Sequence, residues 1–444
     1  MFNRNLYSEL MKWRDRPDRL PLVLRGARQT GKTTLIKEFS RQYESFLYFN
    51  CEELESRRVF TESFSETIKL IDLKYSKKID PSSTLLCIDE IQASPEAIGL
   101  LRFFAEEMPR LSVICAGSLL EQRLSQKLIS FPTGRVEYAF LTPFSFVEFL
   151  QAQGKNLHVD SLKDPVGITP GMHRELMSEL STYFQVGGMP AAVASWVSMG
   201  SIAEVQRLHR NLFQSILDDI GRYLTKSESK YIEFVFDAAP YKIGQRIIYG
   251  NFNNSEYRTR EVKQAFEILQ KAFLVYRVLP TASTAAPLFH NVNKSPKLFF
   301  FDIGMAGSRL MIPAVASSIA PEIKGRIAEQ FVFQEMLAAH IQLPEPALFW
   351  TRDTSNSNAE IDFCSVWNGR PVPIEVKSGS AGTLKSLGVF MKESSGNLAI
   401  RFFDGLPLVQ KNIETGTHVP FTLVNLPLYL AGNWQSALDV LGVR

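Results

Sequence analysis

The sequence lacks the marks of several protein classes. It contains no run of about 18 consecutive apolar residues, so we expect no membrane-spanning helix. Its first 16 residues mix Arg, Asp and Glu with apolar residues and hold no signal-peptide core. The four cysteines form no C-x-x-C pair and the six histidines show no ligand spacing, which argues against a zinc site. These absences favour a cytoplasmic protein.

The chain also lacks a strong charge of one sign. Its 49 Lys and Arg residues face 46 Asp and Glu residues, for a net charge of +3 at pH 7. This balance neither requires nor excludes a nucleic-acid partner. A hydrophobic content of 45% is typical of a globular protein. Because 444 residues exceed one ordinary core, we expect two to four domains.

The most informative stretch reads GARQTGKT and runs from Gly26 to Thr33. It follows apolar residues 22–24 and precedes a helix-like run at 34–41, as a phosphate-binding loop does. Its glycines let backbone N–H groups point at phosphate oxygens, and the helix N-terminus adds partial positive charge. Lys32 is predicted to reach the outer phosphates, and Thr33 to ligate Mg²⁺. The predicted nucleotide-binding residues are Gly26, Ala27, Arg28, Gln29, Thr30, Gly31, Lys32, Thr33 and Thr34.

A second stretch carries two carboxylates. Four apolar residues, 85–88, are followed by Asp89 and Glu90. Ligands of open α/β sheets bind at the carboxyl ends of the strands. Asp89 is therefore predicted to hold Mg²⁺, directly or through water, and Glu90 to orient and activate the attacking water.

Two further residues allow two interpretations each. Ser118 follows the predicted strand 111–116 and either senses the γ-phosphate and attacking water or caps the next helix. Arg135 precedes the predicted strand 136–140. It either acts as an arginine finger on the phosphate of a neighbouring subunit, which implies a homo-oligomer, or lies in a surface ion pair.

These motifs, together with LTPFSFVEF at residues 141–149, resemble the prokaryotic AAA-type ATPases. More narrowly, the chain resembles those that carry a C-terminal "domain of unknown function 4143", from about residue 4 to the end. The resemblance implies an α/β P-loop NTPase core of the additional-strand type that uses ATP. It also implies a helical lid and a winged-helix-like segment.

The segment 183–190 resembles the Gly-x-Pro element in the lid of signal-transduction ATPases, where the proline packs near the nucleotide; Pro190 holds that position. On its residues alone, the segment is only a turn before a helix. Farther on, the order helix, helix, strand, strand suits a winged helix that either binds DNA or packs against the ATPase. Arg258, Arg260 and Lys263 face phosphates in the first case and solvent in the second.

From residue 322 onward the pattern predicts the order α-β-β-β-α-β, with a hairpin turn at Asn368-Gly369. Strand alternation places Glu375 and Lys377 on one face, and the hairpin brings that face beside Asp362. Asp362, Glu375 and, from the helix, Glu329 are predicted to hold Mg²⁺. Lys377 is predicted to position or activate a water for phosphodiester hydrolysis.

This constellation resembles the PD-(D/E)xK nuclease superfamily, with residues 360–362 (EID) in place of its first motif. Residues 322–444 carry 10 Lys or Arg against 12 Asp or Glu, a net charge of −2 that is no electrostatic footprint for DNA. Two hypotheses stand: a nuclease that acts on DNA, or an inactive fold that docks a protein partner.

The predicted protein is thus a Mg²⁺-dependent, ATP-hydrolysing AAA-type ATPase. Its predicted parts are an ATPase core (1–150), a helical lid (151–215), a winged-helix-like domain (216–320) and a PD-(D/E)xK-like α/β domain (321–444).

Overall fold

The computed structural model describes residues 3–117, 131–221, 225–312, 320–340, 348–352, 359–379 and 384–443. The chain forms two compact units. Unit 1 comprises Met1–Thr142, Lys271–Leu274 and His340–Pro344, and unit 2 comprises Pro143–Gln270, Val275–Ala339 and Glu345–Arg444. Over the described residues, none of the helices is both long and apolar enough to span a membrane.

Unit 1 is built on a parallel sheet. Its strands are β1 (Leu22–Arg25), β2 (Ser45–Asn50), β3 (Thr84–Asp89), β4 (Ser112–Ala116) and β5 (Glu137–Phe140). Their spatial order is β2-β3-β4-β1-β5, and every neighbouring pair is parallel. Because β4 lies between β1 and β3, the sheet has the additional strand that was predicted.

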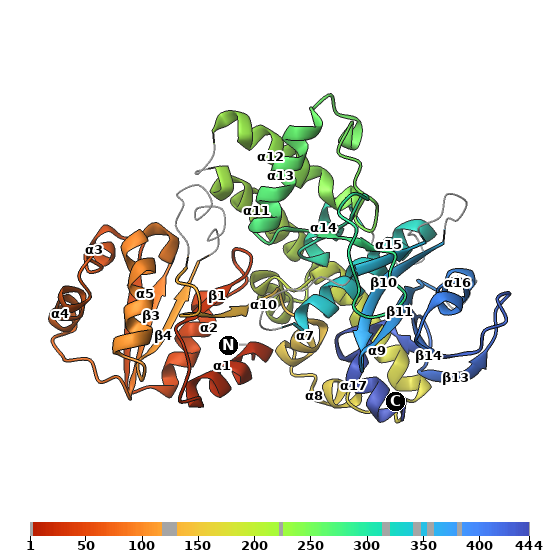
Figure 1. Cartoon of the computed structure of the whole chain (residues 1–444), viewed down its shortest axis with the longest axis horizontal. Coiled ribbons are helices and arrows are strands. Elements are labelled where there is room, and N and C mark those ends of the chain that lie inside the picture. The colour runs from red at the N-terminus through yellow and green to blue at the C-terminus, as the bar shows by residue number, and fades with distance from the viewer. Residues whose placement is uncertain are drawn as a thin grey trace. The chain divides into compact units, whose positions relative to one another are not determined.

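Helices cover both faces of this sheet (Figure 1). The helices α1 (Asn5–Asp15) and α2 (Lys32–Phe39) pack on one face, and α4 (Phe64–Tyr75) and α5 (Pro95–Glu107) pack on the other, near the short α3 (Leu54–Arg57). Side chains alternate along each strand, so Leu22 and Leu24 join the first core and Val23 joins the second. The buried β1 thus leads directly into the phosphate loop.

The first part of unit 2 is helical. It contains α7 (Phe146–Ala152), α8 (Asn156–Ser161), α9 (Pro170–Val186), α10 (Pro190–Met199), α11 (Ile202–Gly221), α12 (Lys226–Ala238) and α13 (Thr259–Lys271). An antiparallel pair of strands follows, β6 (Val275–Val278) and β8 (Lys297–Phe300), and then α14 (Ile303–Arg309). The predicted order helix, helix, strand, strand is confirmed, while its identity as a winged helix remains a prediction.

The last part of unit 2 holds the predicted order α-β-β-β-α-β. These elements are α15 (Pro321–Ala338), β9 (Leu348–Thr351), β10 (Glu360–Trp367), β11 (Arg370–Val376), α16 (Lys385–Glu393) and β12 (Leu398–Phe403). Asn368 and Gly369 make the predicted hairpin turn, with φ angles of 50° and 74°.

The sheet of unit 2 is larger than predicted. It also includes β7 (Pro280–Thr281), β13 (Leu408–Ile413) and β14 (Phe421–Pro427), in the order β13-β14-β12-β11-β10-β9-β7, and α17 (Trp434–Val440) follows. Strands β10 and β11 are antiparallel, whereas β11, β12 and β14 are parallel to one another. β10 and β11 therefore lie inside the sheet, where they carry the carboxylates of interest.

Candidate functional site

The phosphate loop in unit 1 has a backbone that only certain residues tolerate. Gly26 has a φ angle of 142°, and a Cβ atom there would lie 2.2 Å from the carbonyl oxygen of Leu141. Gly31, with a φ angle of 96°, precedes the first residue of α2. The loop therefore runs from the end of β1 to the N-terminus of a helix, where N–H groups without partners inside the helix favour anions.

Lys32 lies inside this loop. Its Nζ atom donates to the carbonyl oxygens of Gly26 and Ala27, both at 2.9 Å. The side chain is buried, and burial lowers the pKa of Lys32 to about 8, against the opposing charges of Glu90 and Asp89. The ammonium is thus held by carbonyl oxygens beside two carboxylates.

An unpredicted arginine anchors the loop. The guanidinium of Arg4 donates to the carbonyl oxygen of Thr30 at 2.9 Å and to that of Thr142 at 2.7 Å. It joins the residue before α1, the phosphate loop and the segment after β5. No local sequence pattern marks this arginine, because these two acceptors are backbone atoms 26 and 138 residues away in the chain.

Asp89 ends β3 and contacts Thr33, while the binding of Mg²⁺ by these two residues remains a prediction. Its Oδ2 atom accepts hydrogen bonds from Thr33 Oγ1 at 2.7 Å and from the hydroxyl of Tyr48 at 2.8 Å. Tyr48 comes from the neighbouring strand β2 and was not predicted. Hydroxyl and carboxylate oxygens are ligands that Mg²⁺ prefers. Together with the loop N–H groups and Lys32, this donor set fits the phosphates of a nucleotide and its Mg²⁺ ion.

Glu90 follows Asp89 with a φ angle of 49°, so the chain turns sharply at the end of β3. The Nε2 atom of Gln92 donates a hydrogen bond to Glu90 Oε2. Burial raises the pKa of Glu90, while the hydrogen bond from Gln92 and the charge of Lys32 lower it. Gln92 was not predicted, although its position two residues after Glu90 is a local signal.

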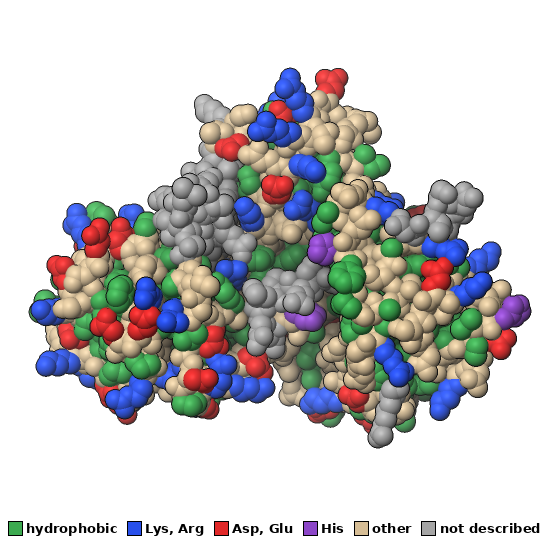
Figure 2. Space-filling view, in the orientation of Figure 1, with side chains coloured by type: hydrophobic (Ala, Val, Ile, Leu, Met, Phe, Trp, Pro, Cys, Tyr) green, Lys and Arg blue, Asp and Glu red, His purple; other side chains and the backbone are tan. Residues whose placement is uncertain are grey.

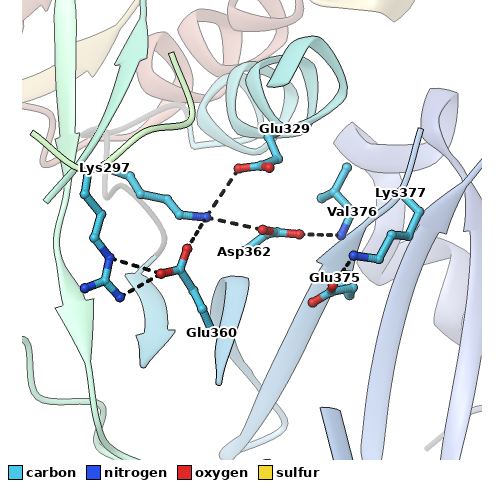
Figure 3. A network of polar contacts seen from close by, with 8 residues as sticks. Lys297, Glu329, Glu360, Asp362, Glu375, Val376 and Lys377 are labelled. Carbon is cyan, nitrogen blue, oxygen red and sulfur yellow. Dashed lines mark hydrogen bonds and ion pairs between the residues drawn. The ribbon is translucent and has the colours of Figure 1, made fainter. Parts of the chain in front are cut away.

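The carboxylates of unit 2 surround a lysine (Figure 3). Lys297 begins β8, and its Nζ atom lies 2.9 Å from Glu360 Oε1, 3.2 Å from Asp362 Oδ1 and 3.3 Å from Glu329 Oε2. Only 4% of its side chain is exposed. Burial acts to lower the pKa of Lys297, but the charges of Asp362, Glu329 and Glu360 raise it above its ordinary value.

The neighbouring strand β11 carries Glu375 and Lys377, which form an ion pair with each other. The backbone N–H of Val376 donates to Asp362 Oδ2 at 2.8 Å (Figure 3). Glu375 and Lys377 therefore share a face as predicted, and the hairpin brings Asp362 beside their strand. Burial raises the pKa of Glu375 to about 7 and that of Glu329 to about 8.

The predicted magnesium ligands do not fit a divalent ion in this arrangement. Within the described ranges, no group of three or more His, Cys, Asp or Glu side chains is arranged to hold a metal. The Lys297 ammonium instead lies among Glu329 and Asp362, together with Glu360. Lys297 was not predicted, because it is 65 residues from Asp362 and belongs to no motif.

Family models match three segments of the chain. Residues 18–150 match the AAA domain, residues 177–315 match a domain of unknown function, DUF8612, and residues 324–420 match a second one, DUF4143. The chain therefore carries an AAA domain and a DUF4143 domain. The AAA domain is a P-loop ATPase domain, and it spans the phosphate loop and the end of β3 described above.

Among solved structures, the chain is similar to the Walker-type ATPase PABY2304 of Pyrococcus abyssi, with 16% identity over 70% of this chain and 96% of that chain (TM-score 0.45). It is also similar to the STAND protein PH0952 of Pyrococcus horikoshii, with 13% identity over 74% and 45% (TM-score 0.29). A third similar structure is that of the Drosophila origin recognition complex bound to DNA, with 13% identity over 69% of this chain and 85% of that chain (TM-score 0.27). No curated protein matches the chain.

Two other residues predicted for the AAA domain have different outcomes. Ser118 lies outside the described residues. The Nε atom of Arg135 lies 2.8 Å from Glu106 Oε1, and 46% of its side chain is exposed. This is the surface ion pair of the second interpretation, and an arginine-finger role remains a prediction.

Pro190 is the first residue of α10, so the preceding segment is the predicted turn before a helix. In this turn, the N–H of Gly188 donates to Asp302 Oδ2 at 2.7 Å, and a Cβ atom at Gly188 would lie 2.2 Å from the carbonyl oxygen of Phe144. Close packing within unit 2 therefore explains the glycine. Contact between Pro190 and a nucleotide remains a prediction.

Three basic residues, for which contact with phosphates and contact with solvent were both left open, are exposed: Arg258 directly before α13, and Arg260 and Lys263 near its start. Figure 2 shows basic and acidic side chains interspersed over α12 and α13, at the top of the view, rather than a patch of one sign. Contact with DNA at these residues remains a prediction.

Proposed function

We propose that the AAA domain binds ATP together with Mg²⁺ and hydrolyses the nucleotide. The observation that carries the proposal is the 2.7 Å contact between Thr33 Oγ1 and Asp89 Oδ2, next to Lys32 in the phosphate loop. Thr33 and Asp89 would hold Mg²⁺, and Lys32 and the loop N–H groups would hold the phosphates. When bound, Mg²⁺ neutralises phosphate charge.

Glu90 is proposed to orient the attacking water and accept its proton. Its place directly after β3, at the edge of the sheet where the phosphate loop begins, supports this role. Burial raises the pKa of Glu90 toward the range in which a general base works best. Gln92 is a positioning residue, because its contact is with the Glu90 carboxylate.

Two substitutions test this proposal. Lys32→Ala is expected to abolish ATP binding, measured by titration with a fluorescent ATP analogue. Glu90→Gln is expected to bind ATP normally and to hydrolyse it slower by orders of magnitude. Lys12→Ala, at an exposed lysine of α1, is the matched control and should behave as wild type. Normal turnover in Glu90→Gln would show that Glu90 is not the general base.

Two functions are considered for the domain that ATP hydrolysis would control. A nuclease acting on DNA is supported by the α-β-β-β-α-β order and by the Glu375–Lys377 pair on β11. An ATP-driven switch whose DUF4143 domain docks a protein partner is supported by Lys297 among the carboxylates and by the net charge of −2. We favour the switch, because a nuclease of this class needs carboxylates that are free to bind metal.

A cleavage assay separates the two functions. Supercoiled plasmid and single-stranded DNA are incubated with Mg²⁺ and wild-type protein, without nucleotide, with ATP and with ADP. The switch predicts no cleavage in any nucleotide state while ATP hydrolysis is intact. Cleavage that disappears in Asp362→Ala and Lys377→Ala, but persists in the exposed control Lys392→Ala, would establish the nuclease instead.

A further inference from the structure

The cluster in unit 2 contains its own cations. Lys297, at the start of β8, contacts carboxylates from two other elements, Glu360 and Asp362 on β10 and Glu329 on α15. The three contacts of 2.9–3.3 Å make full use of its three N–H donors. A buried ammonium is costly without such partners, so the carboxylates and the lysine depend on each other.

A second cation comes from the same part of the chain. Arg246 Nε and Nη2 lie 3.0 and 2.7 Å from Glu360 Oε2, and Arg246 pairs with Lys297 through a backbone β-bridge. The bridge thus places two cations side by side, and both contact Glu360. The cluster therefore joins β8, and the segment paired with it, to the C-terminal sheet.

The carboxylates retain little capacity for another cation. Each of the four acidic residues here contacts a lysine. Three of them contact Lys297, and the fourth, Glu375, pairs with Lys377. Both oxygens of Asp362 are in use, one by Lys297 and one by the N–H of Val376 (Figure 3). One buried carboxylate oxygen of the cluster, Glu375 Oε2, has no hydrogen-bond partner over the described residues.

This arrangement is poorly suited to a divalent ion. Mg²⁺ requires near-octahedral oxygen ligands at about 2.0–2.1 Å. An ion bonded to Asp362 and Glu329 would lie in the space of the Lys297 ammonium and would be repelled by its charge. It would have to displace a side chain that is almost fully buried.

We infer that Lys297 is the permanent counter-cation of this cluster. Its ammonium takes the place of a divalent ion among Glu329, Glu360 and Asp362, and the cluster is a metal-independent joint between β8, β10 and α15. The inference concerns only unit 2 and holds or fails independently of the ATPase activity.

The test counts Mn²⁺ ions bound to the full-length protein without nucleotide, by electron paramagnetic resonance of free Mn²⁺. Wild type and Asp362→Asn should bind the same number, because the cluster binds none. Lys297→Met removes the ammonium at similar side-chain length and should bind one more ion than wild type. That additional ion should be lost in the double variant Lys297→Met, Asp362→Asn. Lys297→Arg keeps the charge and should match wild type.

Two results would overturn the inference. One is a Mn²⁺ ion in wild type that is lost in Asp362→Asn but kept in Asp89→Asn, since such an ion would lie in the cluster. The other is a folded Lys297→Met protein that binds no additional ion. If Lys297→Met does not fold, the numbers of Mn²⁺ ions bound by wild type, Asp362→Asn and Asp89→Asn still show whether the cluster holds an ion.

Discussion

The hydroxyl of Thr33 donates a hydrogen bond to Asp89 Oδ2 at 2.7 Å, which links the phosphate loop to the end of β3. The same oxygen accepts from the Tyr48 hydroxyl at 2.8 Å. Asp89 thus has two hydroxyl partners of different kinds: Thr33 belongs to the loop and Tyr48 belongs to the neighbouring strand. This difference leads to a prediction that separates binding of Mg²⁺ from support of the carboxylate.

Thr33→Val preserves the shape of the side chain but removes a Mg²⁺ ligand. We expect ATP hydrolysis to fall on the order of 100-fold, as when one preorganised electrostatic contact is lost, and to require more Mg²⁺. Tyr48→Phe removes only a support of Asp89 and should change the rate by a few-fold. Steady-state hydrolysis over a series of Mg²⁺ concentrations measures both. Equal losses in the two variants would contradict the assignment of Thr33.

Gln92→Ala should move the pH dependence of hydrolysis. The hydrogen bond from Gln92 lowers the pKa of Glu90, so its removal raises that pKa further above the ordinary value. Glu90 must be ionised to act as a base, and the acidic limb of the pH–rate profile should therefore shift to higher pH. Lys12→Ala is a control in which the profile stays unchanged. An unchanged acidic limb in Gln92→Ala would mean that Gln92 does not position Glu90.

The features that could be predicted depend on residues close together in the sequence. The order strand, loop, helix around Gly26 and Thr33 and the apolar run before Asp89 each lie within a few residues, and the parallel sheet brings their ends together. The hairpin at Asn368 was equally local. What escaped prediction depends on long-range packing: Arg4 binds backbone atoms, and Lys297 reaches carboxylates 32 to 65 residues away.

The strands β13 and β14 escaped prediction for a related reason. β14 is buried over almost its whole length, so it lacks the alternation that marks a half-exposed strand. β13 lies at the edge of the sheet, and none of its residues is buried; its sequence, LVQKNI, does not alternate between apolar and polar residues. From sequence alone, the apolar run of β14 cannot be distinguished from a segment of a buried helix, and β13 cannot be distinguished from a loop. Only the neighbouring strands of the sheet identify them as strands.

Gly26→Ala should destabilise unit 1, whereas Gly99→Ala should not. At Gly26 the φ angle of 142° costs on the order of 1–3 kcal/mol for other residues, and the added Cβ collides with the Leu141 carbonyl. Gly99 lies within α5, and a Cβ there meets nothing within 4 Å, so alanine should stabilise the helix by about 0.5–1 kcal/mol. Thermal unfolding followed by circular dichroism compares the two. A Gly26→Ala protein as stable as wild type would contradict the geometry of the loop.

The buried carboxyl group of Glu335 should make the stability of unit 2 depend on pH. Its side chain is buried in α15, and Oε1 accepts the N–H of Phe146 at 2.9 Å. Burial raises the pKa of Glu335 to about 8. Between its ordinary pKa of about 4.3 and pH 8, the folded protein keeps a proton that the unfolded chain has lost. The free energy of unfolding should therefore decrease as pH rises through this range and level off above it.

Glu335→Gln retains the hydrogen-bond acceptor and cannot ionise, so it should reduce this decrease. Each pKa unit corresponds to about 1.4 kcal/mol, and the difference between wild type and variant should reach a few kcal/mol. Urea unfolding at pH 5.5 and pH 8.5 measures it, with Glu175→Gln on the exposed side of α9 as control. Asp302, Glu375 and Glu329, whose pKa values burial raises to about 6, 7 and 8, contribute decreases of the same sign that the substitution leaves in place. If wild type and Glu335→Gln lose the same stability between the two pH values, the prediction is wrong. Glu335 would then be ionised in the folded protein, and the N–H of Phe146 would donate to a carboxylate.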